Sequence, residues 1–152
     1  MKKTILAILM CGSLVLGMTG CGSFKNELEV GNKSDVQISQ HDVSMSIKDG
    51  TLTNTSATLV LTNNSDKDFQ YGNPYEIEIK KDGEWHKINA ELNFTLPLYN
   101  LKAGETEEIE LNWENGYGKL PSGTYRIVKD IDHETEEGNF ERFNVAVEFT
   151  IQ

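Results

Sequence analysis

The residues that could bind a metal or act as acids and bases are few and scattered along the chain. The histidines His41, His86 and His133 have no metal-ligand spacing, and neither H-E-x-x-H nor C-x-x-C occurs. A hydrolase nucleophile is expected in a context such as G-x-S-x-G, which is absent, and Ser122 lies in a Pro-Ser-Gly turn. Phosphate-binding glycine motifs are also missing. The sequence therefore predicts no enzyme, no metal and no cofactor.

The densest group of carboxylates lies in residues 130–139. Asp130, Asp132 and Glu134 occupy every second position and could offer oxygens to Ca²⁺. Counted from Asp130, the spacing fails the EF-hand pattern because Thr135 rather than Gly stands at the sixth position, although Glu141 stands at the twelfth. A solvated hairpin tip is the preferred interpretation, and cation binding stays the alternative.

Aromatic side chains are the other candidates for a binding site, since exposed Tyr and Trp often anchor interfaces. Tyr75, Trp85 and Trp113 lie in strand-like runs, where we expect them to fill the core. Tyr71 and Tyr117, each followed by Gly, fall between such runs. We therefore expect Tyr71 and Tyr117 to be exposed and name them as candidate binding residues.

The charge balance excludes several classes of partner. The chain has 152 residues with 24 acidic and 14 basic side chains, so its net charge is −10. Proteins that bind nucleic acid carry a basic surface to displace phosphate counterions, so no nucleic acid is expected. Attachment to anionic lipid through a polybasic segment is excluded for the same reason. The length suits one domain with short additional segments.

The first twenty residues have the layout of a secretory signal peptide. Lys2 and Lys3 precede an apolar run over 5–16, which is too short for a bilayer span of about 20 residues. The sequence Met18-Thr19-Gly20-Cys21 that follows resembles the lipobox of bacterial lipoproteins, with Met in place of the usual Leu. This resemblance implies acylation of the Cys21 thiol. It predicts a lipid-anchored protein on the outer face of the cytoplasmic membrane, with the membrane as its partner.

Cleavage before Cys21 would remove Cys11 with the signal peptide, and acylation would block the Cys21 thiol. No thiol would then remain for a disulfide. It would also remove two lysines and no acid, so the mature net charge would be −12. We expect residues 21–41 to form a lipidated, flexible tether, because the stretch through Ser34 is polar and lacks periodicity. Val36 and Ile38 alternate with polar residues, and an earlier start of the first strand stays the alternative. The folded domain is then expected over 42–152.

From residue 42 onward, apolar residues alternate with polar ones in short runs. Successive side chains of a strand point to opposite faces, so each run predicts a strand with one buried side. The turn at Asp82-Gly83 is a strong hairpin signal. About seven antiparallel strands predict an all-β fold of the β-sandwich type. The runs begin near the following residues: Val43, Ala57, Tyr75, Trp85, Ile109, Tyr125 and Phe143.

The segment Leu120-Pro121-Ser122-Gly123-Thr124-Tyr125-Arg126 resembles the approach to a late strand in immunoglobulin-like sandwiches. That resemblance implies a structural corner in which the Tyr125 hydroxyl bonds back to the main chain. The longer run over 113–129 is similar to a bacterial immunoglobulin-like domain of surface lipoproteins, and the likeness extends over 42–152. A weaker likeness, in Leu101-Lys102-Ala103-Gly104-Glu105 and the Leu-Pro-x-Gly-Thr-Tyr run, is to the intracellular proteinase inhibitor family.

These resemblances leave two functions to separate. The first is a cell-surface module with a non-enzymatic binding or scaffolding role, and the second is a secreted proteinase inhibitor that presents a loop. The segment 89–104 discriminates between them, because an inhibitor must offer a protruding segment to its target. We expect Phe94 and Leu98 to be largely buried, since a loop exposing several large apolar side chains would favour aggregation.

Overall fold

The computed structural model describes residues 28–38, 41–136 and 138–152, which form ten strands and one short helix. Every pair of neighbouring strands among them is antiparallel. In chain order the elements are β1 (Val30–Lys33), β2 (Val43–Ile47), β3 (Ser56–Asn63), β4 (Phe69–Gly72), β5 (Glu76–Lys81), β6 (Glu84–Ile88), β7 (Leu98–Leu101), β8 (Thr106–Asn112), α1 (Glu114–Tyr117), β9 (Gly123–Glu136) and β10 (Asn139–Ile151).

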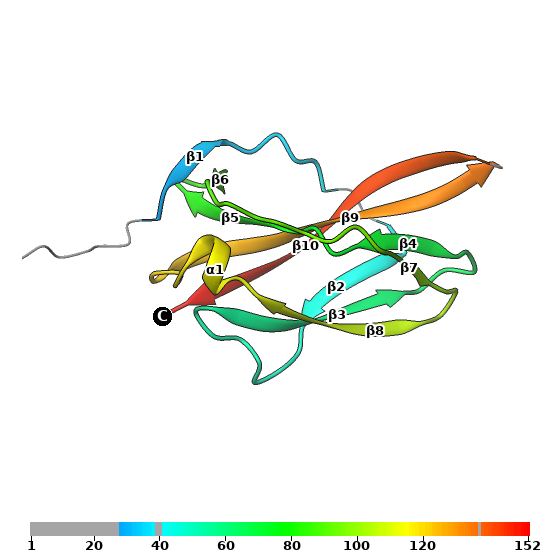
Figure 1. The fold of residues 1–152 in the computed structure, drawn as a ribbon, viewed down its shortest axis with the longest axis horizontal. Helices are drawn as coiled ribbons and strands as arrows, with labels where there is room; N and C mark the ends of the chain where they lie inside the picture. Colours follow the sequence, from blue (N-terminus) through cyan, green and yellow to red (C-terminus); the bar gives the residue numbers. More distant parts are fainter. Residues whose placement is uncertain (1–27, 39–40, 137) are drawn as a thin grey trace, which may run out of the picture.

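The strands form two sheets packed as a sandwich (Figure 1). The larger sheet has seven strands in the order β1-β6-β5-β9-β4-β7, and β10 pairs with the long strand β9. The smaller sheet has the order β2-β3-β8. The β9–β10 hairpin projects from one end of the molecule (Figure 1). We call the side of the larger sheet that faces the smaller sheet its inner face, and the opposite side its outer face.

The alternation in the sequence explains both sheets. Strand β3 alternates between buried and half-buried residues along its whole length, and its buried side chains lie in the core. All seven runs predicted from the sequence are strands, so the all-β sandwich prediction is confirmed. The structure adds three strands, β1, β4 and β7, each of four residues. Runs this short carry too few alternating positions to be recognised.

The predicted corner has the expected contact. The Tyr125 hydroxyl donates a hydrogen bond to the Pro121 carbonyl at 2.8 Å, and its ring is fully buried beside Phe149. Gly123 lies against this ring, because a Cβ there would come within 3.2 Å of it. The corner therefore ties the start of β9 to the preceding turn.

The prediction of a flexible tether up to residue 41 is wrong for residues 28–38. Val30 pairs with Ile88 and Lys33 with His86, so β1 extends the larger sheet. We call residues 28–38 the strap. The Ser34 hydroxyl donates to Glu78 at 2.5 Å, on the outer face. The strap is thus joined to β6 by main-chain pairing, and it also contacts the carboxylate of Glu78.

That carboxylate belongs to a buried ion pair. Glu78 is fully buried, and Arg126 lies 2.6 Å from it. The guanidinium of Arg126 also stacks 4.7 Å from the centre of the Trp85 ring. Trp85 is therefore half-buried on the outer face, and the expectation that it fills the core is wrong. Tyr75 and Trp113 do lie in the core.

Within the described residues, no helix is long and apolar enough to cross a membrane. Residues 1–27, which include the predicted signal peptide and Cys21, lie outside the described part of the chain.

Candidate functional site

The edge strand β7 is open on one side in the described part of the chain. It pairs with β4, with Leu98 opposite Gly72 and Tyr99 opposite Tyr71, and it ends the strand order of the larger sheet. Pro97 immediately precedes β7, and a proline at the start of a strand is compatible with an edge position because it has no main-chain N–H to donate. Its free side leaves main-chain donors and acceptors available to another strand.

Large apolar side chains are exposed at this edge. Leu96 is 85% exposed, Leu98 63% and Tyr99 41%. The expectation that Phe94 and Leu98 are largely buried is therefore wrong for Leu98. Phe94 is half-buried, with its ring packed edge-on 5.2 Å from that of Tyr75. Phe94 thus holds the start of the segment to the core, and Leu101 is buried at its end, whereas Leu96 and Leu98 between them are exposed.

On the inner face, Tyr99 lies beside a pair of hydrogen-bonded polar groups, the Tyr71 hydroxyl and the Glu107 carboxylate. Its ring stacks 5.3 Å from the ring of Tyr71, and the Tyr71 hydroxyl donates to the Glu107 carboxylate at 2.5 Å. Burial, and then the hydrogen bond to Glu107, raise the pKa of Tyr71. Glu107 comes from β8, the edge strand of the smaller sheet, and points toward the sandwich interior beside Leu61. A half-buried carboxylate thus lies close to the open edge of β7.

Lys129 lies deeper in the same region and is almost fully buried. Its ammonium donates to the Gly72 carbonyl at 2.7 Å and to the Pro74 carbonyl at 3.0 Å, and it lies 5.5 Å from the centre of the Tyr71 ring. Burial lowers its pKa to about 8. Lys129 therefore donates hydrogen bonds to two main-chain carbonyls, at the end of β4 and in the connection to β5.

The two tyrosines named from the sequence are not exposed, so that expectation is wrong. Tyr71 is 4% and Tyr117 is 9% exposed. The Tyr117 hydroxyl accepts a hydrogen bond from the Ile77 main-chain N–H at 2.9 Å, and burial raises its pKa to about 12. The glycine after each tyrosine signalled a chain bend, but it did not show on which side of the sheet the ring would lie. Tyr99, which the sequence did not single out, is the exposed ring.

Comparison with known protein families identifies a match for most of the chain. Residues 39–150 match the bacterial Ig-like domain family. The chain belongs to that family. No curated protein matches it.

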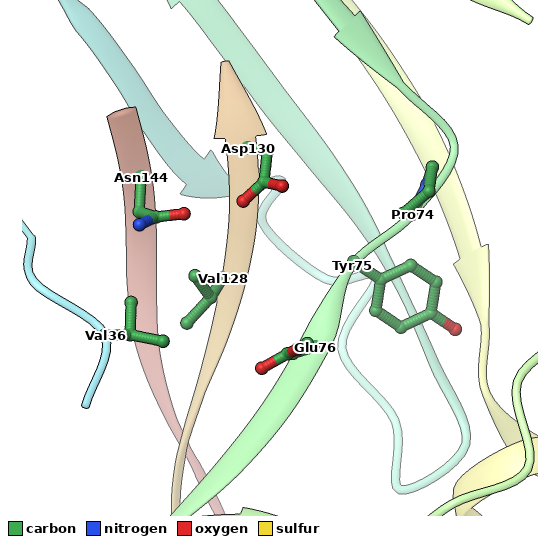
Figure 2. A pocket seen from close by; sticks show the side chains of 7 residues that line it. All are labelled: Val36, Pro74, Tyr75, Glu76, Val128, Asp130 and Asn144. Carbon is green, nitrogen blue, oxygen red and sulfur yellow. The ribbon is translucent and has the colours of Figure 1, made fainter. Parts of the chain in front are cut away.

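The Ig-like domain also has a small cavity on its outer face, where the strap meets β5, β9 and β10 (Figure 2). Its volume is about 110 Å³, with Val36 facing Val128 and with the carboxylates of Glu76 and Asp130 nearby. Ligand pockets usually measure about 300–1,000 Å³. The cavity is thus too small for an organic ligand, and both carboxylates already have cations within 4 Å.

The acidic stretch lies at the end of the β9–β10 hairpin. Arg142 makes two hydrogen bonds to Asp132, at 2.7 and 3.0 Å, and lies 3.5 Å from Asp130. Among the residues that the structure describes, no three His, Cys, Asp or Glu side chains are grouped to hold a metal ion. The histidines are separate too: His41 stacks on Phe143, and His133 lies beside Phe69.

Proposed function

We propose that this protein is a lipid-anchored, non-enzymatic binding or scaffolding module on the outer face of the cytoplasmic membrane. The proposal has two parts, the localisation of the protein and its binding surface. The localisation is inferred from the signal peptide layout and the lipobox-like sequence ending at Cys21. The surface comes from the Ig-like domain.

The observation that carries the binding role is the exposure of Leu98 and Tyr99 on the edge strand β7, and of Leu96 just before it. The domain is otherwise strongly acidic, with a net charge of −10 for the chain. Exposed apolar groups of this kind on a soluble domain usually mark an interaction site. They also sit on a rigid sheet, which supports a preformed contact surface.

Lipid anchoring at Cys21 is tested by feeding cells an alkyne-bearing fatty acid and detecting its attachment to the protein. We expect label on the wild type and none on Cys21→Ala. Cys11→Ala is the matched control, because Cys11 lies within the apolar run, and it should keep the label. Label that survives Cys21→Ala, or membrane retention that is unchanged in this variant, would refute the anchor.

A second candidate is the proteinase inhibitor, and the exposure of Leu96 and Leu98 favours it. An inhibitor needs a protruding, pre-organised segment, and Leu96 and Leu98 are exposed, although residues 98–101 form β7 within the larger sheet and Leu101 is buried. The test measures the activity of secreted endopeptidases with increasing amounts of the protein. Inhibition at nanomolar concentration that Leu98→Asp abolishes would replace the binding role by this one; no inhibition would remove it.

A further inference from the structure

We propose that the open edge of β7 binds an extended peptide by strand addition, and that the peptide alternates aliphatic with basic residues. The aliphatic side chains would pack on Leu98 at the outer face, and Lys or Arg would reach Tyr99 and Glu107 at the inner face. This inference rests on the proposed function, because it names the class of partner for the binding module.

The main chain of β7 supplies the pairing. β7 has a neighbour only in β4 among the described strands, so its other side presents N–H and C=O groups that pair with no strand, although the Leu101 carbonyl accepts from the Asn63 side chain at 3.1 Å. Proteins often protect such edges with charged side chains, and β8 does so with Glu107, Glu108 and Glu110. None of the four residues of β7 is charged. Charged side chains, one of the usual protections against another strand, are thus missing from β7, although the strand is short and follows Pro97.

The outer face of the edge selects aliphatic side chains. Leu98 lies opposite Gly72, so no side chain from β4 covers it on that face. A residue of an added strand directly opposite Leu98 would share this face and lie about 4.5–5.5 Å away between Cβ atoms. A Val, Ile or Leu there would bury apolar surface that Leu98 now exposes to water.

The inner face selects a cation. Tyr99 points to this face and remains partly exposed, and Glu107 lies beyond the Tyr71 ring on which Tyr99 stacks. Lys129 lies 5.5 Å from the centre of the Tyr71 ring, and its ammonium hydrogen-bonds to two main-chain carbonyls rather than to Glu107. The side chain of an added strand opposite Tyr99 would therefore meet the Tyr99 ring, and only a long side chain would extend past it toward Glu107. Lys or Arg satisfies both, through a cation–π contact and an ion pair.

A second copy of this chain is a poorer occupant for the same reason. Pairing β7 with its own copy would bring a second Tyr99 and a second Glu107 to the inner face, with no new cation. Both molecules would also carry a net charge of −10. Electrostatic complementarity therefore favours a basic peptide.

The test titrates a short, fluorescently labelled peptide of alternating valine and lysine into the full-length protein in uncharged detergent micelles, with anisotropy as the readout. Two matched peptides carry glutamate in place of lysine, or proline in place of the central valine. We expect saturable binding of the valine–lysine peptide only. Hydrogen exchange of the complex should show added protection at the amides of 98–101 and none at those of β2.

Three variants assign the contact. Leu98→Asp should weaken binding at least about tenfold, as for an anchor residue. Phe140→Asp is its control, because it makes the same kind of change at an exposed apolar residue of the hairpin tip. Glu107→Gln keeps an acceptor for the Tyr71 hydroxyl and should weaken binding about fivefold, as expected for one ion pair. Glu110→Gln removes the same charge from the other face of β8 and should change nothing.

Several results would overturn the inference. These are absence of binding, equal binding of the glutamate or proline peptide, or equal effects of Glu107→Gln and Glu110→Gln. Sedimentation that reveals a dimer broken by Leu98→Asp would assign the edge to a second copy instead. All of these can occur while Cys21 remains acylated, so failure of the peptide site is distinguishable from failure of the anchor.

Discussion

The buried ion pair on the outer face gives a sharp test of how the larger sheet is held together. Glu78 is fully buried and accepts from Arg126 at 2.6 Å and from the Ser34 hydroxyl. Glu78→Ala would leave the nearly buried Arg126 guanidinium without its carboxylate. Removing one member of a buried pair typically costs about 3–5 kcal/mol, because the remaining charge is uncompensated. We expect the free energy of unfolding to fall by this amount.

The matched control is the exposed pair of Lys48 and Glu108, whose ammonium and carboxylate are 2.7 Å apart with about half of each side chain exposed. Glu108→Ala should cost less than about 1 kcal/mol, because solvent screens an exposed pair. The double variant Glu78→Leu, Arg126→Leu should recover most of the loss, since replacing a buried pair by apolar residues is often close to neutral.

The measurement is urea unfolding followed by tryptophan fluorescence, with the slope against urea checked for constancy. Trp85 reports on the ion pair directly, because Arg126 stacks on it, and Trp113 reports on the core. If Glu78→Ala cost no more than Glu108→Ala, water would have to reach the pair. The argument that the strap shields a buried charge would then be refuted.

Three further outcomes follow. Tyr125→Phe should cost about 1–3 kcal/mol, because the Pro121 carbonyl loses its donor; a loss of a few tenths would mean that the carbonyl is solvated. Stability should fall as pH rises from about 10 toward 12, since Tyr117 keeps its proton in the folded state up to a pKa of about 12; an unchanged urea midpoint there would contradict this. Lys129 has a folded pKa of about 8, so below that pH its charge opposes folding and the opposition is relieved as pH rises toward 10.5; Lys129→Met should remove this rise between pH 8 and 10.

The sequence alone determined the strand-rich architecture and the side of each long strand that faces the core. These are local properties, because alternation with a period of two already assigns successive side chains to opposite faces. The corner at Tyr125 was readable for the same reason, since its hydroxyl bonds only four residues back along the chain. The hairpin at Asp82-Gly83 was also local, and both residues have positive φ.

Only the tertiary structure decided what covers each element. The strap pairs with β6 and contacts Glu78, which lies 44 residues from Ser34, and its own sequence carried no sign of these contacts. The tyrosines at 71 and 117 are buried by partners about 36 and 40 residues distant, although their own sequence context indicated exposed turns. Leu96 and Leu98 are exposed because β7 lies at an edge, and edge position depends on strand order. Alternation determines which way a side chain points, whereas burial depends on which distant segment lies opposite it.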